Sequence, residues 1–254
     1  MKLAGKCAVI TGGGRGIGAA VARALAEAGV GVLVAARSSG EVDAVANTLR
    51  AQGHRASAVT ADVTRPESVQ ALARTAAEVL GDIDILINNA GSSSSAPLKR
   101  TTVEEWNRLL AVNATSTFLC TQGFLPGMLD RKCGRVVNLA SVAGLFGAKY
   151  IAAYSAAKHA VVGFTRSMAE EVAGSGVTVN AVCPGYVDTP MTGQSLDRIM
   201  QTTGKSRPEA LDAVLAHSGQ SRLITADEVA SAVLAVCSGS ENGAAVVLDG
   251  KGPP

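Results

Sequence analysis

Short apolar runs rich in β-branched residues alternate along the chain with longer stretches of helical character. The runs typical of buried strands cover residues 7–11, 30–36, 55–61, 83–88, 135–141, 177–183 and 244–249. Helical patterns lie between them over residues 17–28, 41–51, 66–80 and 103–130, and from Tyr154 to about Gly174 and Gly176. Strands that alternate with helices form βαβ units, in which helices cover both faces of a parallel sheet. The predicted fold is therefore α/β, a doubly wound sheet of seven parallel strands with helices on both faces.

The predicted strands continue along nearly the whole chain without a linker, which favours one domain over residues 1–254. One irregular, polar stretch interrupts the pattern at about residues 188–225. Connections of this length inside a compact domain are usually functional, so we interpret this stretch as a partly helical lid over a binding crevice. Pro126 and Gly127 are expected to kink or break the end of the long helix.

A glycine-rich turn, Thr11-Gly12-Gly13-Gly14-Arg15-Gly16-Ile17-Gly18, joins the first predicted strand to the first helix. Glycines allow the backbone to turn tightly and to approach a pyrophosphate, which the helix N-terminus attracts. The spacing Gly14-x-Gly16-x-x-Ala19 formally matches a dinucleotide fingerprint but begins late relative to the strand. The spacing Gly12-x-x-x-Gly16-x-Gly18 fits the junction better. In a first βα crossover it indicates a Rossmann-type dinucleotide site.

The end of the second predicted strand indicates which dinucleotide binds. A site selective for NAD usually places Asp or Glu there, to hold the ribose 2′-hydroxyl. In this chain Ala36 takes that place with Arg37 beside it, and Arg15 lies in the glycine turn. Two guanidinium groups without a carboxylate suit a 2′-phosphate, so we predict NADP(H) as the cofactor.

Tyr154 and Lys158 lie four residues apart at the start of an apolar helical pattern, which places both side chains on one helix face. An unperturbed tyrosine has a pKa of about 10 and exchanges protons poorly at neutral pH. A neighbouring lysine cation favours the phenolate and is expected to lower that pKa. The pair therefore has the composition of a general acid or base.

Composition excludes several other functions. Aromatic residues make up 3% of the chain and the net charge is +2 without a long basic run, which argues against a nucleic-acid partner. No apolar stretch is long enough to span a bilayer, and the N-terminal residues lack the apolar stretch of a signal peptide. The cysteines (Cys7, Cys120, Cys133, Cys183, Cys237) and histidines (His54, His159, His217) show neither disulfide nor metal-ligand spacing. We expect a reduced, cytoplasmic protein without a metal or membrane partner.

Together these residues resemble the short-chain dehydrogenase/reductase family over essentially the whole chain. The motifs that carry the resemblance, in chain order, are Gly12/Gly16/Gly18, Asp62-Val63, Asn88-Asn89-Ala90-Gly91, Asn113, Ser141, Tyr154-x-x-x-Lys158, Pro184-Gly185 and Thr189. Residues 154–165 and 179–185 look most like the branch that reduces 3-oxoacyl thioesters and polyketides. Members of the family are commonly tetramers, so the resemblance implies a homotetramer.

The resemblance implies four catalytic residues. Tyr154 would protonate the carbonyl oxygen during reduction, and Lys158 would lower the pKa of Tyr154 and hold the nicotinamide ribose. Ser141 would hydrogen-bond the substrate carbonyl and stabilise charge on its oxygen. Asn113 would hold a water that connects Lys158 with solvent. Asn88, in contrast, is expected to be structural.

The glycine turn, the arginines and the resemblance also give a set of cofactor contacts. Asp62 would accept a hydrogen bond from the adenine amino group, and Val187 and Thr189 would contact the nicotinamide carboxamide. The full set is Gly12, Arg15, Gly16, Ile17, Gly18, Arg37, Asp62, Val63, Asn89, Ala90, Gly91, Tyr154, Lys158, Pro184, Gly185, Val187 and Thr189.

The predicted activity is NADPH-dependent reduction of a carbonyl to a secondary alcohol, with a small-molecule or carrier-bound 3-oxoacyl thioester as the substrate. Fold-level likeness does not fix the substrate. One alternative is oxidation or reduction of a small sugar, steroid or cyclic alcohol or ketone at the same site. Another is a cofactor-binding protein without turnover, against which the complete set of catalytic residues argues.

Overall fold

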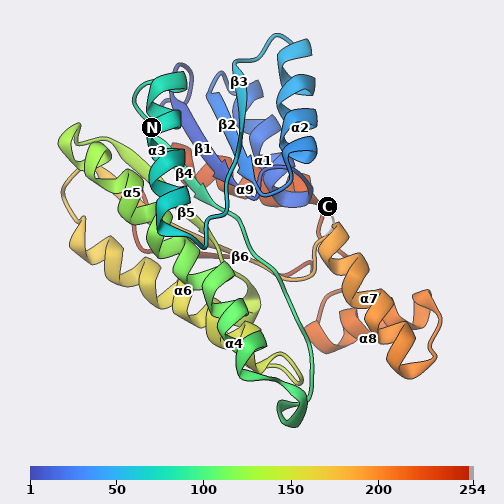
Figure 1. Cartoon of the computed structure of the whole chain (residues 1–254). Coiled ribbons are helices and arrows are strands. Elements are labelled where there is room, and N and C mark those ends of the chain that lie inside the picture. The colour runs from blue at the N-terminus through green and yellow to red at the C-terminus, as the bar shows by residue number, and fades with distance from the viewer. Residues whose placement is uncertain (252–254) are drawn as a thin grey trace.

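The computed structural model describes residues 1–251, so residues 252–254 of the predicted domain lie outside the described residues. Within this part of the chain, seven parallel strands form one sheet in the order β3-β2-β1-β4-β5-β6-β7 (Figure 1). The strands are β1 (Cys7–Thr11), β2 (Gly31–Ala36), β3 (Ala56–Thr60), β4 (Ile85–Asn88), β5 (Gly134–Leu139), β6 (Val177–Pro184) and β7 (Ala245–Leu248). The predicted doubly wound α/β fold of the Rossmann type is confirmed.

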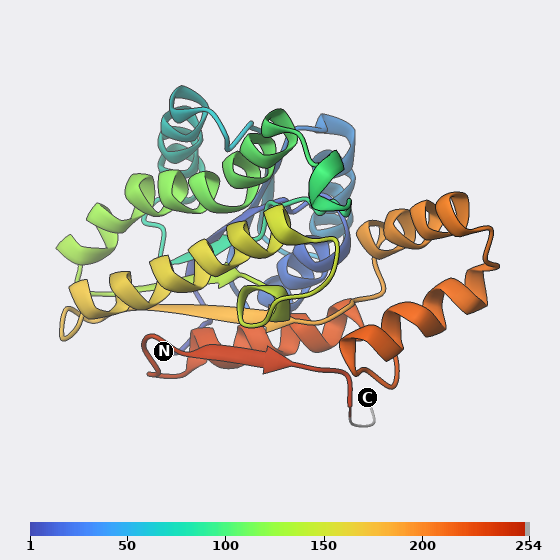
Figure 2. The ribbon, with the colours of Figure 1, turned by 90° about the horizontal axis from the view of Figure 1, so that it is seen from below.

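Helices cover both faces of the sheet. They are α1 (Gly16–Glu27), α2 (Ser39–Ala51), α3 (Pro66–Leu80), α4 (Val103–Leu110), α5 (Ser116–Asp130), α6 (Ala152–Glu171), α7 (Pro190–Thr203), α8 (Arg207–Ser218) and α9 (Ala226–Ser238). Successive side chains of a strand point to opposite faces. In β1, Ala8 and Ile10 accordingly pack with α1, α2 and α9, whereas Cys7 and Val9 pack with α3, α5 and α6. Figure 2 shows α6 and α9 on opposite sides of the sheet.

The long helix predicted over residues 103–130 is divided into α4, a π-helical turn (Ala111–Thr115) and α5. Of the two predicted effects of Pro126 and Gly127, a kink or a break, the break does not occur, because α5 continues through Pro126 to Asp130. Proline removes one backbone N–H, which leaves the carbonyl four residues earlier without its helical partner. Pro126 and Gln122 both lie on the exposed face of α5, where water can bind that carbonyl.

The irregular segment 188–225 is partly helical, as predicted, because α7 and α8 lie within it. Figures 1 and 2 show these two helices as a pair that projects from the body of the molecule. A small apolar cluster of Leu196, Ala210 and Val214 joins them. The next helix, α9, is an element that the sequence pattern did not predict. No helix among residues 1–251 is both long and apolar enough to cross a membrane.

Two 3₁₀ turns complete the fold, Leu98–Arg100 and Val142–Gly144. The strand was predicted to end at Ser141, but β5 ends at Leu139 because the second of these turns follows it. Ser141 is the N-cap of this turn, and its hydroxyl accepts a hydrogen bond of 3.1 Å from the Ala143 amide. N-capping satisfies an amide at the start of the turn and fixes the Ser141 side chain.

Candidate active site

A crevice of about 380 Å³ lies at the carboxyl-terminal ends of β1, β2 and β4. The chain leaves β1 toward β2 on one side and enters β4 on the other, so this is the switch point at which open α/β sheets bind ligands. The predicted cofactor residues that line the crevice are Gly12, Arg15, Gly16, Ile17, Arg37, Asp62, Val63, Asn89, Ala90, Gly91 and Thr189. The other predicted cofactor residues, Gly18, Tyr154, Lys158, Pro184, Gly185 and Val187, are not among the lining residues.

Most glycines of the turn have no room for a side chain, and Gly12 and Gly18 matter most for its contact with β1. A Cβ atom on Gly12 would lie 2.8 Å from Asn89 Nδ2, and the positive φ of 64° at Gly12 disfavours any L side chain. A Cβ atom on Gly18 would lie 2.2 Å from the Gly12 carbonyl oxygen. The first turn of α1 can therefore approach the end of β1 only because these two positions are glycine.

Asn89 and Thr11 hold the turn in place. The Asn89 side-chain amide donates hydrogen bonds to the Thr11 and Gly12 carbonyls, at 2.9 and 3.0 Å. The Thr11 hydroxyl accepts hydrogen bonds from the Asn89 and Ala90 amides, at 3.0 and 3.1 Å. The segment after β4 is thus bound to the glycine turn and forms the opposite wall of the crevice. Asn88 is structural in its contacts, since its side chain donates to Thr121 and Asn138 inside the fold.

Asp62 lies at the end of the crevice that β3 supplies. Its Oδ1 accepts hydrogen bonds from the Thr64 hydroxyl at 2.7 Å and from the Thr64 amide at 3.0 Å. The Thr64 hydroxyl, and more weakly the Arg37 cation, lower the pKa of Asp62 below its usual value. The carboxylate is therefore ionised and oriented at neutral pH, ready to accept a further hydrogen bond.

Ala36 leaves the end of β2 without a carboxylate, as expected, but a carboxylate that was not expected reaches the same part of the crevice from α2. Glu41, in the first turn of α2, lines the crevice together with Arg15 and Arg37. Its Oε1 lies 3.2 Å from Arg15 Nη1, and the two form an ion pair. The sequence pattern missed this residue because Glu41 follows the strand end by five positions and reaches the crevice only through the way α2 packs. The net charge of these three side chains remains positive.

Asn113 is buried inside the π-helical turn between α4 and α5. Its Nδ2 donates to the carbonyls of Ser92 and Leu109, both at 2.9 Å, and its Oδ1 accepts from the Ser92 amide at 3.3 Å. A Cβ atom on Gly91 would lie 2.7 Å from Asn113 Oδ1 and 3.7 Å from Lys158 Nζ. Asn113 and Lys158 therefore both lie beside Gly91. π-helical turns often occur at functional sites, because they re-aim one side chain within a helix.

Ser141, Tyr154 and Lys158 are brought together beside the crevice. Tyr154 and Lys158 lie one turn apart on α6, with Lys158 Nζ 5.9 Å from the centre of the Tyr154 ring. The Ser141 side chain lies close enough to the Tyr154 hydroxyl to lower the pKa of Tyr154. Lys158 Nζ donates to the Leu139 carbonyl at 2.7 Å, which ties α6 to the end of β5. The i, i+4 spacing of the sequence thus produces the juxtaposition that was expected.

The pKa values of this pair differ from the expectation. Burial raises the pKa of Tyr154 to about 12, and the Ser141 side chain only partly opposes this. Burial also lowers the pKa of Lys158 to about 8. The expected lowering of the tyrosine pKa by the lysine is therefore not produced by the protein groups alone, because removal from water is the largest cause and raises the pKa. At neutral pH Tyr154 carries its proton and Lys158 is mostly cationic.

The segment after β6 closes the site on the side of α7. Val187 pairs with Ile224 as an isolated parallel bridge, and Thr189 is the N-cap of α7. A Cβ atom on Gly16 would lie 3.3 Å from Thr189 Cγ2, so the glycine turn and the start of α7 face each other closely. Tyr186, which the sequence analysis did not include, lies near enough to Tyr154 to raise its pKa further.

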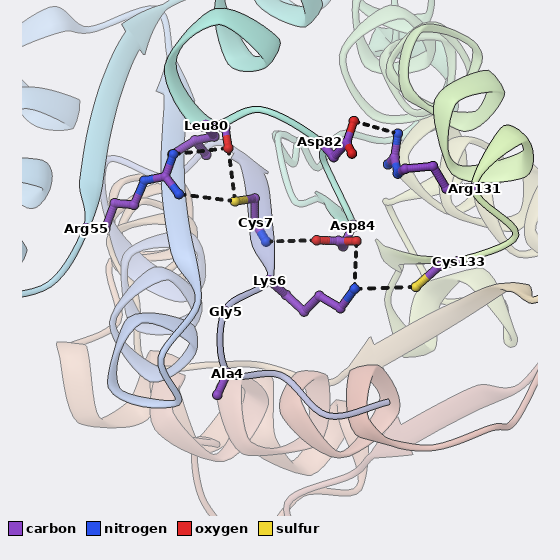
Figure 3. A pocket seen from close by; sticks show the side chains of 10 residues that line it. All are labelled: Ala4, Gly5, Lys6, Cys7, Arg55, Leu80, Asp82, Asp84, Arg131 and Cys133. Atoms are coloured by element: carbon purple, nitrogen blue, oxygen red, sulfur yellow. Dashed lines mark hydrogen bonds and ion pairs between the residues drawn. The ribbon is translucent and has the colours of Figure 1, made fainter.

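A larger cavity of about 510 Å³ lies at the opposite edge of the sheet, where β1 and β5 begin (Figure 3). Its charged side chains already have partners. Lys6 pairs with Asp84 at 3.1 Å, Arg131 pairs with Asp82 at 3.2 Å, and Arg55 donates to backbone carbonyls. Parallel α/β sheets bind their ligands at the carboxyl ends of the strands, so size does not make this cavity the functional site.

Comparison with known proteins identifies the family. Residues 6–199 match the model of the short chain dehydrogenase family. A 3-oxoacyl-acyl-carrier-protein reductase from Vibrio cholerae is 40% identical over 233 residues, 92% of this chain and 90% of that protein. D-β-hydroxybutyrate dehydrogenase from Rhizobium meliloti is 38% identical over 235 residues, 90% of each chain. The crystal structure of a variant of actinorhodin polyketide ketoreductase with NADPH superposes with a TM-score of 0.92 at 35% identity, covering 96% of both chains.

The match to the family model covers the glycine turn, the Asn89 segment and the Ser141, Tyr154 and Lys158 cluster. The relatives cover nearly the full length of the chain, and their names describe reductases and dehydrogenases. This chain therefore belongs to the short-chain dehydrogenase family of oxidoreductases.

Proposed function

We propose that the chain reduces a carbonyl to a secondary alcohol with NADPH, and that its substrate is a 3-oxoacyl thioester. The observation that carries this proposal is the cluster of Ser141, Tyr154 and Lys158, in which a protonated phenol lies beside a hydroxyl and shares its helix face with a cation. A protonated acid, a hydrogen-bond donor and a nearby positive charge are the groups that carbonyl reduction requires.

The crevice fits the proposed cofactor. The space that Gly12 and Gly18 leave lets the first amides of α1 reach a pyrophosphate, which the positive end of the helix also attracts. Arg15 in the glycine turn and Arg37 at the end of β2 supply charge for a 2′-phosphate, and the oriented carboxylate of Asp62 supplies an acceptor for the adenine amino group. Glu41 opposes the 2′-phosphate, because a phosphate must compete with it for Arg15.

The nicotinamide, when bound, supplies the hydride. The protein groups bind the carbonyl and move the proton. The Ser141 hydroxyl donates a hydrogen bond to the carbonyl oxygen, and the Tyr154 hydroxyl donates its proton to the same atom. The Lys158 cation stabilises the phenolate that remains and holds the ribose hydroxyls. In the reverse direction Tyr154 acts as the base.

Asn113 and Lys158 provide the route by which Tyr154 regains its proton. Both side chains lie beside Gly91, and within residues 1–251 Asn113 Oδ1 accepts only one weak hydrogen bond, of 3.3 Å. A carbonyl oxygen has two acceptor sites, so this atom can hold a water next to Lys158 Nζ. We propose that this water connects Lys158 with solvent.

The relatives favour the thioester over other carbonyl compounds. The Vibrio cholerae relative is named for a 3-oxoacyl group on a carrier protein, and the actinorhodin relative for a polyketide. The lid of residues 188–225 is the part of the site that would contact the acyl chain or its carrier. We further propose that the chain forms a homotetramer, which exposed apolar side chains such as Trp106 on α4 and Phe118 on α5 support and light scattering would test.

A substrate screen tests the proposal. NADPH oxidation is measured with acetoacetyl thioesters, with free 3-oxo acids and with cyclic ketones at equal concentration. The proposal expects the highest kcat/KM for the thioesters. Higher values for the cyclic ketones would favour the alternative substrate class, and absence of NADPH oxidation with every carbonyl would contradict the proposed reaction.

A further inference from the structure

Gln220, just after α8, holds the backbone of Tyr186 from both sides. Its Oε1 accepts a hydrogen bond from the Tyr186 amide at 2.7 Å, and its Nε2 donates to the Tyr186 carbonyl at 3.1 Å. Nε2 also donates to the Arg222 carbonyl at 3.1 Å. The side chain is buried, with 7% of the residue exposed. Only one orientation of the amide satisfies all three partners, so both ends of the side chain are fixed.

Three segments that are distant in sequence meet at this amide. A Cβ atom on Gly185 would lie 2.5 Å from Gln220 Oε1, and one on Gly250 would lie 2.9 Å from Gln220 Nε2. The end of β6 and the segment after β7 therefore approach the Gln220 side chain only because both positions are glycine. The Gly185 amide in turn donates to the Leu248 carbonyl at 2.9 Å, which fixes the same junction from the other side.

Tyr186 connects this junction with the reaction centre and with the lid. Its side chain packs against the apolar cluster of Leu196, Ala210 and Val214 that joins α7 and α8. On the other side Tyr186 lies close enough to Tyr154 to raise the pKa of the Tyr154 hydroxyl. Two residues earlier, the Pro184 carbonyl lies 3.4 Å from the Ser141 hydroxyl. The backbone that Gln220 holds is thus in contact with the hydroxyl proposed to bind the substrate carbonyl.

From this geometry we infer that Gln220 is a positioning residue for the reaction. Its side-chain amide sets the place of the Pro184–Tyr186 backbone relative to Ser141 and Tyr154, and it couples that backbone to the end of the lid. This inference rests on the proposed function, since it assigns Gln220 to the carbonyl-binding side of the same site. Among the described residues, the Gln220 side chain hydrogen-bonds to the backbone of Tyr186 and Arg222 and to neither of the two hydroxyls.

The chemistry of the amide distinguishes positioning from mere filling of space. Leucine fills a similar volume but leaves the Tyr186 amide without an acceptor in a buried place. Glutamate keeps the acceptor, but its carboxylate faces the Tyr186 and Arg222 carbonyls in place of a donor. When that carboxyl is protonated, its O–H can donate to the Tyr186 carbonyl and restore the pair. Burial beside carbonyl oxygens raises the pKa of such a carboxyl, which brings this restoration into an accessible pH range.

The test compares wild type, Q220L and Q220E with the control Q201L and Q201E variants. Gln201 is an exposed glutamine on α7. Its substitution therefore changes the lid but not the junction around Gln220. For each protein we would measure kcat and KM for an acetoacetyl thioester across pH, the Kd of NADPH, and hydrogen exchange of the peptide that contains Tyr186. We expect Q220L to lower kcat about tenfold to a hundredfold, as small displacements near reacting groups do. The Kd of NADPH should change by less than about threefold, because Gln220 is not among the residues that line the crevice.

Q220E gives the decisive profile. Its kcat, divided by that of wild type at the same pH, should rise as pH falls, while the same ratio for Q201E stays level. The Tyr186 amide should exchange faster in Q220L than in Q201L. A flat Q220E ratio, or a Q220L kcat equal to that of Q201L despite faster exchange, would overturn the inference. Absence of carbonyl turnover in wild type would instead overturn the proposed function, so the two failures are distinguished.

Discussion

Replacing Glu41 with glutamine should tighten NADPH binding and leave NADH binding nearly unchanged. Glu41 lies in the crevice and holds Arg15 in an ion pair of 3.2 Å. A 2′-phosphate must compete with this carboxylate for Arg15, and it is also repelled by the negative charge of the carboxylate. NADH carries a neutral 2′-hydroxyl in the same place, and a carboxylate can accept a hydrogen bond from it.

The magnitude follows from the exposure of the pair. The Arg15 and Glu41 side chains are 60% and 39% exposed, so the ion pair is screened by water and contributes about 0.2–1 kcal/mol. Two unit charges about 4 Å apart in water interact by about 1 kcal/mol, and a phosphate carries about 1.5–2 charges. Releasing Arg15 and removing the repulsion should therefore favour NADPH by about 1.7–3 kcal/mol, or about 20- to 160-fold in Kd.

Titration calorimetry with NADPH and NADH on wild type, E41Q and D43N measures this effect. Asp43 is exposed on the same helix, so D43N removes an equal charge without touching the crevice. The increase in NADPH affinity in E41Q should be smaller at high salt, because salt screens both the Arg15–Glu41 ion pair and the repulsion between Glu41 and the phosphate. Equal NADPH affinities in E41Q and D43N, or an equal gain for NADH, would refute the reasoning.

Three further predictions concern other charged groups. R37A should weaken NADPH more than NADH in the same titrations, since Arg37 lies beside the proposed 2′-phosphate place; equal losses would remove that argument. Because burial places the pKa of Lys158 at about 8, its cation is present below that pH and lost above it, so kcat/KM for carbonyl reduction should decline as pH rises through about 8. A pH profile that remained flat well above 8 would show that the lysine charge is not required. The hydrogen bonds with Arg222 lower the pKa of Glu228 to about 2, so its stabilising effect is complete above the unfolded value of about 4.5 and is lost as pH falls toward 2. E228Q should therefore lower Tm at neutral pH, and its difference from wild type should narrow in acid; a constant difference would contradict the linkage.

The sequence predicted those features that depend on local spacing. Tyr154 and Lys158 share a helix face because of the helical repeat, and the glycine turn follows from its place between a buried strand and a helix. The parallel sheet was predicted because strand-like apolar runs alternate with helical patterns along the chain. Each single pattern is formed by residues that are close in sequence, so local geometry determines it.

Features that depend on packing between distant segments were not predictable in this way. Glu41 enters the crevice because α2 packs above the glycine turn, and Gln220 meets Tyr186 across 34 positions of sequence. The π-helical turn at Asn113 has no pattern that distinguishes it from an α-helix. The Tyr154 pKa rises because the side chain is buried, and burial depends on the packing around it. The neighbouring lysine in the sequence had indicated a lower pKa.

The central claim is that Tyr154 donates the proton to the substrate carbonyl, and comparison of Y154F with Y150F tests it most directly. Tyr150 is an exposed tyrosine four residues earlier, outside the cluster of Ser141, Tyr154 and Lys158, and serves as the matched control. Y154F should lower kcat for carbonyl reduction by about 10²–10⁴-fold, with the Kd of NADPH close to that of wild type, whereas Y150F should retain wild-type turnover. Turnover in Y154F comparable to that in Y150F would contradict the assignment of Tyr154 as the general acid.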